Sequence, residues 1–111
     1  MVLKTTDEIV ITKHAMDRAK RRMNIRGVKK LVILARKALR YGIDKDRARF
    51  NTYLVEYIKK KYQKYYKADN IRVYGHFVYI FKKKVLVTIL ELPSTFRKDW
   101  NKYSKNLKQK I

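Results

Sequence analysis

After Asn70 the hydrophobic pattern of the chain changes from a helical to an extended period, and this change constrains the fold more than any other feature. Three runs rich in β-branched and aromatic residues follow, at Ile71–Tyr74, Phe77–Lys82 and Val85–Leu92. Two residues separate each run from the next, and connections this short join antiparallel neighbours. The sequence therefore predicts a meander of three strands, which Pro93 ends.

The rest of the chain has the pattern of amphipathic helices. Thr12 is the candidate N-cap of the first helix, a break is expected at Asn24–Gly27, and Asp44 is the candidate N-cap of the third helix. A short extended stretch at Glu8–Ile11 precedes the first helix. The predicted helices run from Lys13 to Met23, from Val28 to Tyr41, from Asp44 to Lys67 and from Thr95 to Leu107.

Helices followed by a run of strands and a further helix are typical of an α+β fold. We expect three N-terminal helices packed on a three- to four-stranded antiparallel meander, followed by a C-terminal helix. A length of 111 residues suits a single domain over residues 1–111. Because 46% of the residues are apolar, the chain can form one modest core despite its charge.

The net charge is the main indication of function. The chain has 30 Lys and Arg against 9 Asp and Glu, which gives a formal net charge of +21. A charge so far from zero repels itself and weakens a compact fold, and a bound polyanion would neutralise it. We therefore expect RNA or a ribonucleoprotein complex as the partner, with an acidic protein partner or a membrane surface as weaker alternatives.

Several other classes of site are disfavoured. The chain has no cysteine and two histidines, so it lacks the ligands of disulfides, thiolate metal sites and the common zinc sites. No apolar run reaches the roughly 18 residues of a membrane span, and the N-terminus lacks the pattern of a signal peptide. We expect a cytoplasmic protein with no metal, no cofactor and no membrane partner. The oligomeric state stays open.

Lysines and arginines are concentrated in a few segments suited to contact with the phosphate backbone. Tyrosines interleave with the lysines near the end of the third predicted helix, where they can stack on unpaired bases. The alternative is that any one lysine is a solvated helix position and that the tyrosines are core. The expected nucleic-acid-binding residues are Arg18, Arg21, Arg22, Lys59, Lys60, Lys61, Lys64, Lys67, Lys82, Lys83, Lys84, Arg97 and Lys98.

The first predicted helix also holds a candidate chemical site. Its spacing places His14, Arg18, Arg21 and Arg22 together on the face opposite its apolar residues. A histidine beside arginines supplies the base and the cations that metal-free RNA cleavage needs. The alternative is an exposed or structural histidine, with arginines that bind phosphate without chemistry.

Two segments carry a resemblance to a known group. Ile-Thr-Lys-His-Ala-x-x-Arg-x-x-x-Arg (Ile11–Arg22) and Leu-Val-Thr-Ile-Leu-x-Leu-Pro (Leu86–Pro93) resemble small proteins of Firmicutes and their phages. These are similar in turn to the barnase–EndoU–colicin–RelE superfamily. The resemblance implies N-terminal helices on an antiparallel sheet, with metal-free endoribonuclease or toxin activity in many members.

The residues that match the site pattern of that superfamily are His14, Arg18, Arg22 and Thr88. The Lys/Tyr helix at 44–67 has no counterpart in a simple RelE-like protein and is interpreted as an added binding arm. Thr88 has two readings, because its hydroxyl is either a satisfied core group or a site group that faces the first helix.

These observations favour two functions. The first is nucleic-acid or ribonucleoprotein binding, for instance by a phage-encoded inhibitor of a host defence complex such as a CRISPR effector. The alternative is a metal-free endoribonuclease of RelE-like toxin type, in which His14 is the base and Arg18, Arg22 and Thr88 are phosphate ligands. A structural protein of a phage or ribosome-associated particle is a third and weaker possibility.

Overall fold

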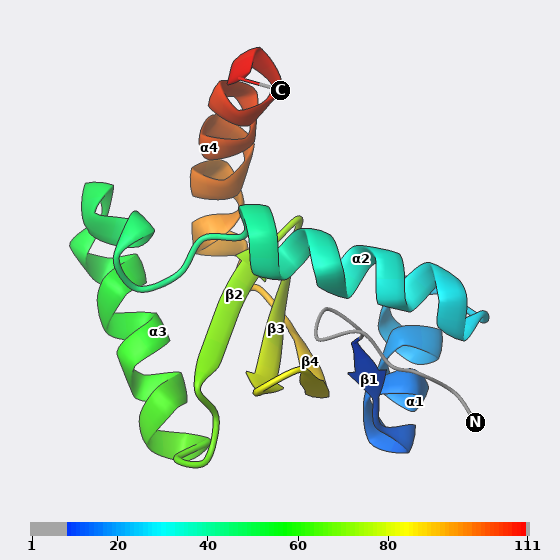
Figure 1. Cartoon of the computed structure of the whole chain (residues 1–111). Coiled ribbons are helices and arrows are strands. Elements are labelled where there is room, and N and C mark those ends of the chain that lie inside the picture. The colour runs from blue at the N-terminus through cyan, green and yellow to red at the C-terminus, as the bar shows by residue number, and fades with distance from the viewer. Residues whose placement is uncertain (1–8, 111) are drawn as a thin grey trace.

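The computed structural model describes residues 9–110, with side chains as far as Leu107; Glu8 of the predicted extended stretch lies outside this range. The predicted α+β class is confirmed (Figure 1). The elements in order are β1 (Val10–Ile11), α1 (Lys13–Met23), α2 (Val28–Tyr41), a 3₁₀ turn (Arg47–Phe50), α3 (Thr52–Lys64), β2 (Asn70–Tyr74), β3 (Phe77–Lys82), β4 (Val85–Glu91), a second 3₁₀ turn (Ser94–Phe96) and α4 (Arg97–Lys110).

The sheet has four strands in the order β1-β4-β3-β2. Strands β2, β3 and β4 form the predicted antiparallel meander. Strand β1 corrects the expectation of a purely antiparallel sheet, because Val10 pairs with Val85 and Ile11 with Leu86 in parallel. No short turn links β1 to β4, so hairpin geometry does not dictate the direction of this pair.

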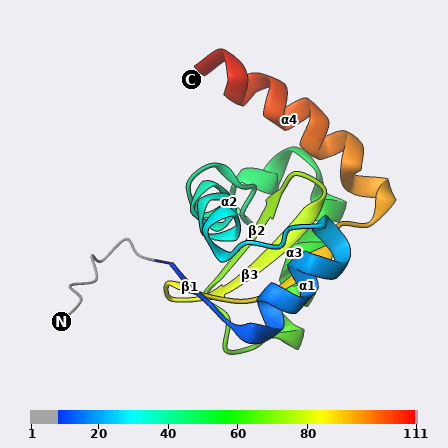
Figure 2. The ribbon, with the colours of Figure 1, turned by 90° about the vertical axis from the view of Figure 1, so that its right-hand side faces the viewer.

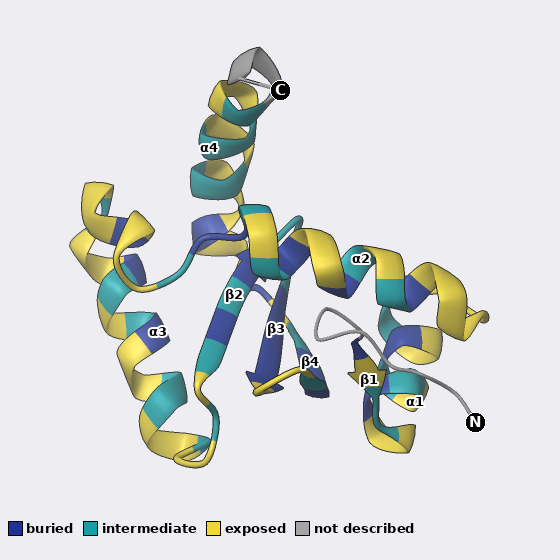
Figure 3. Cartoon of the chain, in the orientation of Figure 1, coloured by how far each residue is buried: buried dark blue, intermediate teal, exposed yellow. Residues whose placement is uncertain are grey.

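Helices cover both faces of the sheet (Figures 1 and 2). Along β3, Tyr79 and Phe81 point into a core with α1 and α2, whereas Val78 and Ile80 point into a second core with α3 and the start of α4. Figure 3 shows the buried positions on the strands and on the inner sides of these helices. Burial on both faces explains why β3 is a nearly continuous apolar run.

The third predicted helix was wrong in its bounds. Asp44 does accept a hydrogen bond from the Arg47 N–H at 2.7 Å, but it caps only the short 3₁₀ turn. Helix α3 begins after Asn51, whose side chain accepts from the Tyr53 N–H at 3.0 Å and donates to Asp99 at 3.0 Å. These bonds hold Asn51 in an extended conformation and interrupt the helix.

Both late helices also differ from prediction at their ends. Helix α3 ends at Lys64 and not at Lys67, because Tyr65 leaves the helical region and residues 65–67 form a turn. The last helix begins at Arg97 and not at Thr95, after a 3₁₀ turn in which the Phe96 N–H donates to the Pro93 carbonyl at 2.9 Å.

Gly42 ends α2 at a point where a side chain has no room. A Cβ at this position would overlap the Ala38 carbonyl oxygen and lie 2.9 Å from the Cβ of Arg72. We expect Gly42→Ala to lower the free energy of unfolding by about 2 kcal/mol in urea denaturation. Gly27→Ala is the matched control, since nothing lies within 4 Å of a Cβ there. Equal losses in the two variants would contradict this assignment.

Candidate nucleic-acid interface

The end of α3 and the β3–β4 turn are held together by one carboxylate. Both oxygens of Asp69 accept from the Lys83 N–H, at 2.8 and 2.9 Å, and the Asp69 N–H donates to the Phe81 carbonyl at 3.1 Å. Lys83 has a φ of 54°, a conformation uncommon for residues other than glycine, and the carboxylate holds it there. Two lysine-rich segments that are separate in the sequence thereby form one surface.

The tyrosines interleaved with lysines divide into two kinds. Tyr57 packs against Phe96, with ring centroids 5.4 Å apart, and the Tyr62 hydroxyl accepts from the Ile71 N–H at 2.9 Å. Burial is the main cause that raises the pKa of both tyrosines, so they stay protonated members of the core. Base stacking by Tyr57 and Tyr62 is therefore excluded by their packing.

Tyr65 and Tyr66 are the two that reach the surface beside lysines. The Lys64 ammonium lies 5.7 Å from the centroid of the Tyr65 ring, and the Lys67 ammonium lies 5.8 Å from that of Tyr66. Tyr66 is 78% exposed, which is unusual for a large aromatic side chain. Each pair joins a cation to a ring face, so the surface offers phosphate contact and stacking at the same place.

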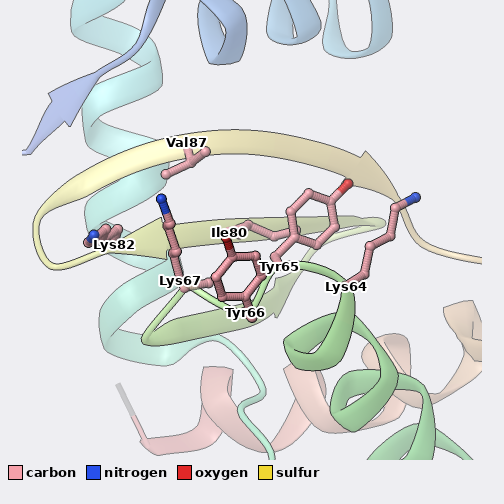
Figure 4. A pocket seen from close by; sticks show the side chains of 8 residues that line it. Lys64, Tyr65, Tyr66, Lys67, Ile80, Lys82 and Val87 are labelled. Carbon is pink, nitrogen blue, oxygen red and sulfur yellow. The ribbon is translucent and has the colours of Figure 1, made fainter.

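A cavity of about 310 Å³ opens between these side chains and the sheet (Figure 4). Ile80 and Val87 on the strands form its floor, and the two tyrosines lie across it with lysines at the rim. We call this site the lysine–tyrosine pocket; its lining residues are Lys64, Tyr65, Tyr66, Lys67, Ala68, Ile80, Lys82 and Val87.

The local backbone explains why the pocket exists. Helix α3 ends at Lys64, so the part of the sheet beyond it is covered only by the turn at 65–67. A bulge in β4 also leaves Val87 without a partner, because Ile80 pairs with Thr88 while Phe81 pairs with Leu86. Neither the helix end nor the bulge was predicted, and Asp69, Ala68, Ile80 and Val87 were therefore missed as members of the site.

The remaining predicted binding residues lie outside this pocket. Lys59 makes an ion pair with Glu56 at 3.7 Å, Lys61 lies over the Tyr57 ring at 5.2 Å, and Lys60 is exposed on α3. Arg97 and Lys98 are exposed at the start of α4, which extends from the opposite end of the sheet (Figure 1). Two ion pairs occur within residues 9–110, so the acids of the fold neutralise little of its positive charge.

The basic face of α1 is a separate site. The Arg18 Nε donates to the Nε2 of the exposed His14 at 3.4 Å, and this bond requires an unprotonated Nε2. Arg21 is exposed, whereas the Arg22 guanidinium donates to the Ile89 carbonyl at 2.9 Å. Arg22 therefore attaches α1 to β4 with one side of its fork.

Thr88 is not brought together with the residues of α1. It pairs with Ile80 and so lies on the α3 side of the sheet, whereas α1 packs on the other side. Regular alternation from Leu86 would have turned Thr88 toward α1, but the extra residue at Val87 reverses its direction. The four residues that match the superfamily pattern thus do not form one constellation.

The Thr88 hydroxyl also corrects both readings made from the sequence. Its side chain is 3% exposed, and the Oγ1 atom has no hydrogen-bond partner among the described residues. It is neither a satisfied core group nor a group that faces the first helix. A buried hydroxyl without a partner lowers the stability of the fold.

Comparisons with protein-family models, with curated proteins and with solved structures found no match in any of the three. Within residues 9–110, no cluster of three or more His, Cys, Asp or Glu side chains is placed to hold a metal ion. No helix in the same part of the chain is long and apolar enough to cross a membrane.

We expect Thr88→Val to raise the free energy of unfolding by about 1 kcal/mol, because valine has the same shape without the unpaired hydroxyl. Thr12→Val should have the opposite effect, since Thr12 accepts from the Ala15 N–H and donates to the Val87 carbonyl, both at 3.0 Å. Urea denaturation of both variants measures the two shifts. A loss of stability in Thr88→Val would show that the hydroxyl has a partner.

Proposed function

We propose that this protein binds single-stranded RNA and that the lysine–tyrosine pocket and the adjoining turn contact the strand. The observation that carries the proposal is the Asp69 link to Lys83, which gathers lysines from α3 and from the β3–β4 turn around two accessible tyrosines. Each lysine at a phosphate releases counterions, and this release is the main source of affinity in sequence-independent binding.

The chemistry of the surface favours a single strand over the other polyanions considered. A duplex keeps its bases stacked inside, whereas an unpaired strand offers base faces to Tyr65 and Tyr66. An acidic protein would pair with the ammonium groups but leave the exposed Tyr66 ring without use. A ribonucleoprotein, such as a defence complex with an accessible guide strand, would offer the same phosphates and bases.

Three lysines of the pocket test this proposal. Lys64→Gln, Lys67→Gln and Lys82→Gln together should weaken binding of an oligouridine, because each lysine lost removes one phosphate contact. The slope of log affinity against log salt should become shallower by about 0.7 for each contact, or about 2 in all. Fluorescence anisotropy over a range of salt concentrations measures both quantities.

The matched control removes the same charge on the other side of the sheet. Lys29, Lys30 and Lys37 are exposed on α2, which packs against the opposite face. The triple Gln variant at these positions should keep most of the affinity and most of the salt slope. If both triple variants lost equal affinity, net charge alone would account for binding and the pocket would have no special part.

A second candidate function is metal-free RNA cleavage on α1. The observation in its favour is the contact between Arg18 and His14, which pairs an unprotonated base with a fixed cation on an exposed face. Arg21 lies exposed beside them as a further phosphate ligand. Thr88 contributes nothing to this site, because it lies on the other side of the sheet.

The binding proposal predicts that RNA stays intact when incubated with the purified protein in EDTA, and that His14→Ala keeps the wild-type affinity. Gel electrophoresis of labelled RNA measures cleavage and anisotropy measures affinity. Cleavage that disappears in His14→Ala would instead establish the endoribonuclease and would assign the base to His14.

A further inference from the structure

We propose that the lysine–tyrosine pocket seats one unpaired base of the bound RNA strand and recognises it without regard to its identity. This inference rests on the RNA-binding function proposed above. It adds that the site is more than a charged surface, because one base leaves the solvent and enters the hollow between the end of α3 and strands β3 and β4.

The shape and lining of the pocket agree with such an occupant. Its volume of about 310 Å³ lies at the small end of the range for ligand pockets. The floor is apolar, since Ile80 is 1% exposed and Val87 lies beside it. Figure 4 shows the rings of Tyr65 and Tyr66 in front of this floor. A flat base can lie against such rings and side chains with its faces shielded from water.

The charges lie where the phosphates of that nucleotide would lie. Lys64, Lys67 and Lys82 line the opening, and Figure 4 shows Lys64 on one side of the tyrosines with Lys82 on the other. A nucleotide combines an apolar, flat base with an anionic phosphate, and this pocket combines an apolar floor with a cationic rim. The strand would therefore cross the rim while a single base turns inward.

The lining also determines how the base is recognised. Apart from the lysine ammonium groups, the polar side-chain groups of the lining are the hydroxyls of Tyr65 and Tyr66. No amide or carboxylate side chain lines the pocket to read the edge of a base, so contact is by stacking and apolar packing. Affinity should thus depend on the presence of a base and hardly on which base it is.

The test compares an oligouridine of about ten nucleotides with an oligomer of equal length that carries abasic sites throughout. Val87→Phe fills the pocket and leaves every lysine in place. This variant should bind oligouridine about tenfold more weakly but bind the abasic oligomer as the wild type does. Val28→Phe, at an exposed position of α2, is the matched control and should change neither affinity.

Tyr66→Ala provides a second variant that does not disturb the core, because this side chain is largely exposed. It should also reduce the difference in affinity between oligouridine and the abasic oligomer. Oligoadenosine and oligocytidine should bind within about threefold of oligouridine. A preference of more than about tenfold for one base would overturn recognition without regard to identity.

The remaining outcomes separate this inference from the function on which it rests. If the triple lysine variant weakens binding but Val87→Phe and Tyr66→Ala do not, the base-seating inference fails and RNA binding at this surface stands. An equal effect of Val87→Phe on both oligomers would likewise overturn the inference. If vesicles of phosphatidylserine and phosphatidylcholine compete with RNA and depend on Val87, the pocket takes a lipid chain and the inference fails. Absence of binding to any oligomer would refute the RNA-binding function itself.

Discussion

The structure depends on a sheet whose central strands bury side chains on both faces. Alternate residues of β3, such as Tyr79 and Ile80, enter two different cores, so helices must pack on both sides. Helices α1 and α2 complete one core, and α3 with the start of α4 completes the other. Because α3 ends at Lys64, it leaves part of its face to a turn, and the lysine–tyrosine pocket is the space that results.

The Asp69 carboxylate gives this space its electrostatic character. Lysines of the α3 end and of the β3–β4 turn repel each other, and in a chain with a net charge of +21 few acids are present to offset such repulsion. Asp69 brings the two segments together through the backbone N–H of Lys83 and leaves the lysine side chains at the rim exposed. The fold thus maintains a concentration of positive charge that a phosphate backbone would neutralise.

Much of the architecture was predictable from local patterns, and the site was not. The three meander strands, α1 and α2 follow from periodicity, short turns and caps. The interruption at Asn51 depends on its contact with Asp99, which is distant in the sequence. The bulge at Val87 likewise appears only when β3 and β4 are paired, and it reverses the direction of Thr88. The sequence predicted which segments are basic, but tertiary contacts decide which of them meet.

The central claim is that RNA contacts the surface between the end of α3 and the β3–β4 turn. Amide chemical shifts of the ¹⁵N-labelled protein, recorded during a titration with oligouridine, test this claim most directly. The account predicts that the largest changes fall on residues 64–68 and 80–88, which form and adjoin the lysine–tyrosine pocket. Changes confined to the His14 and Arg18 face of α1, or to the start of α4, would contradict it.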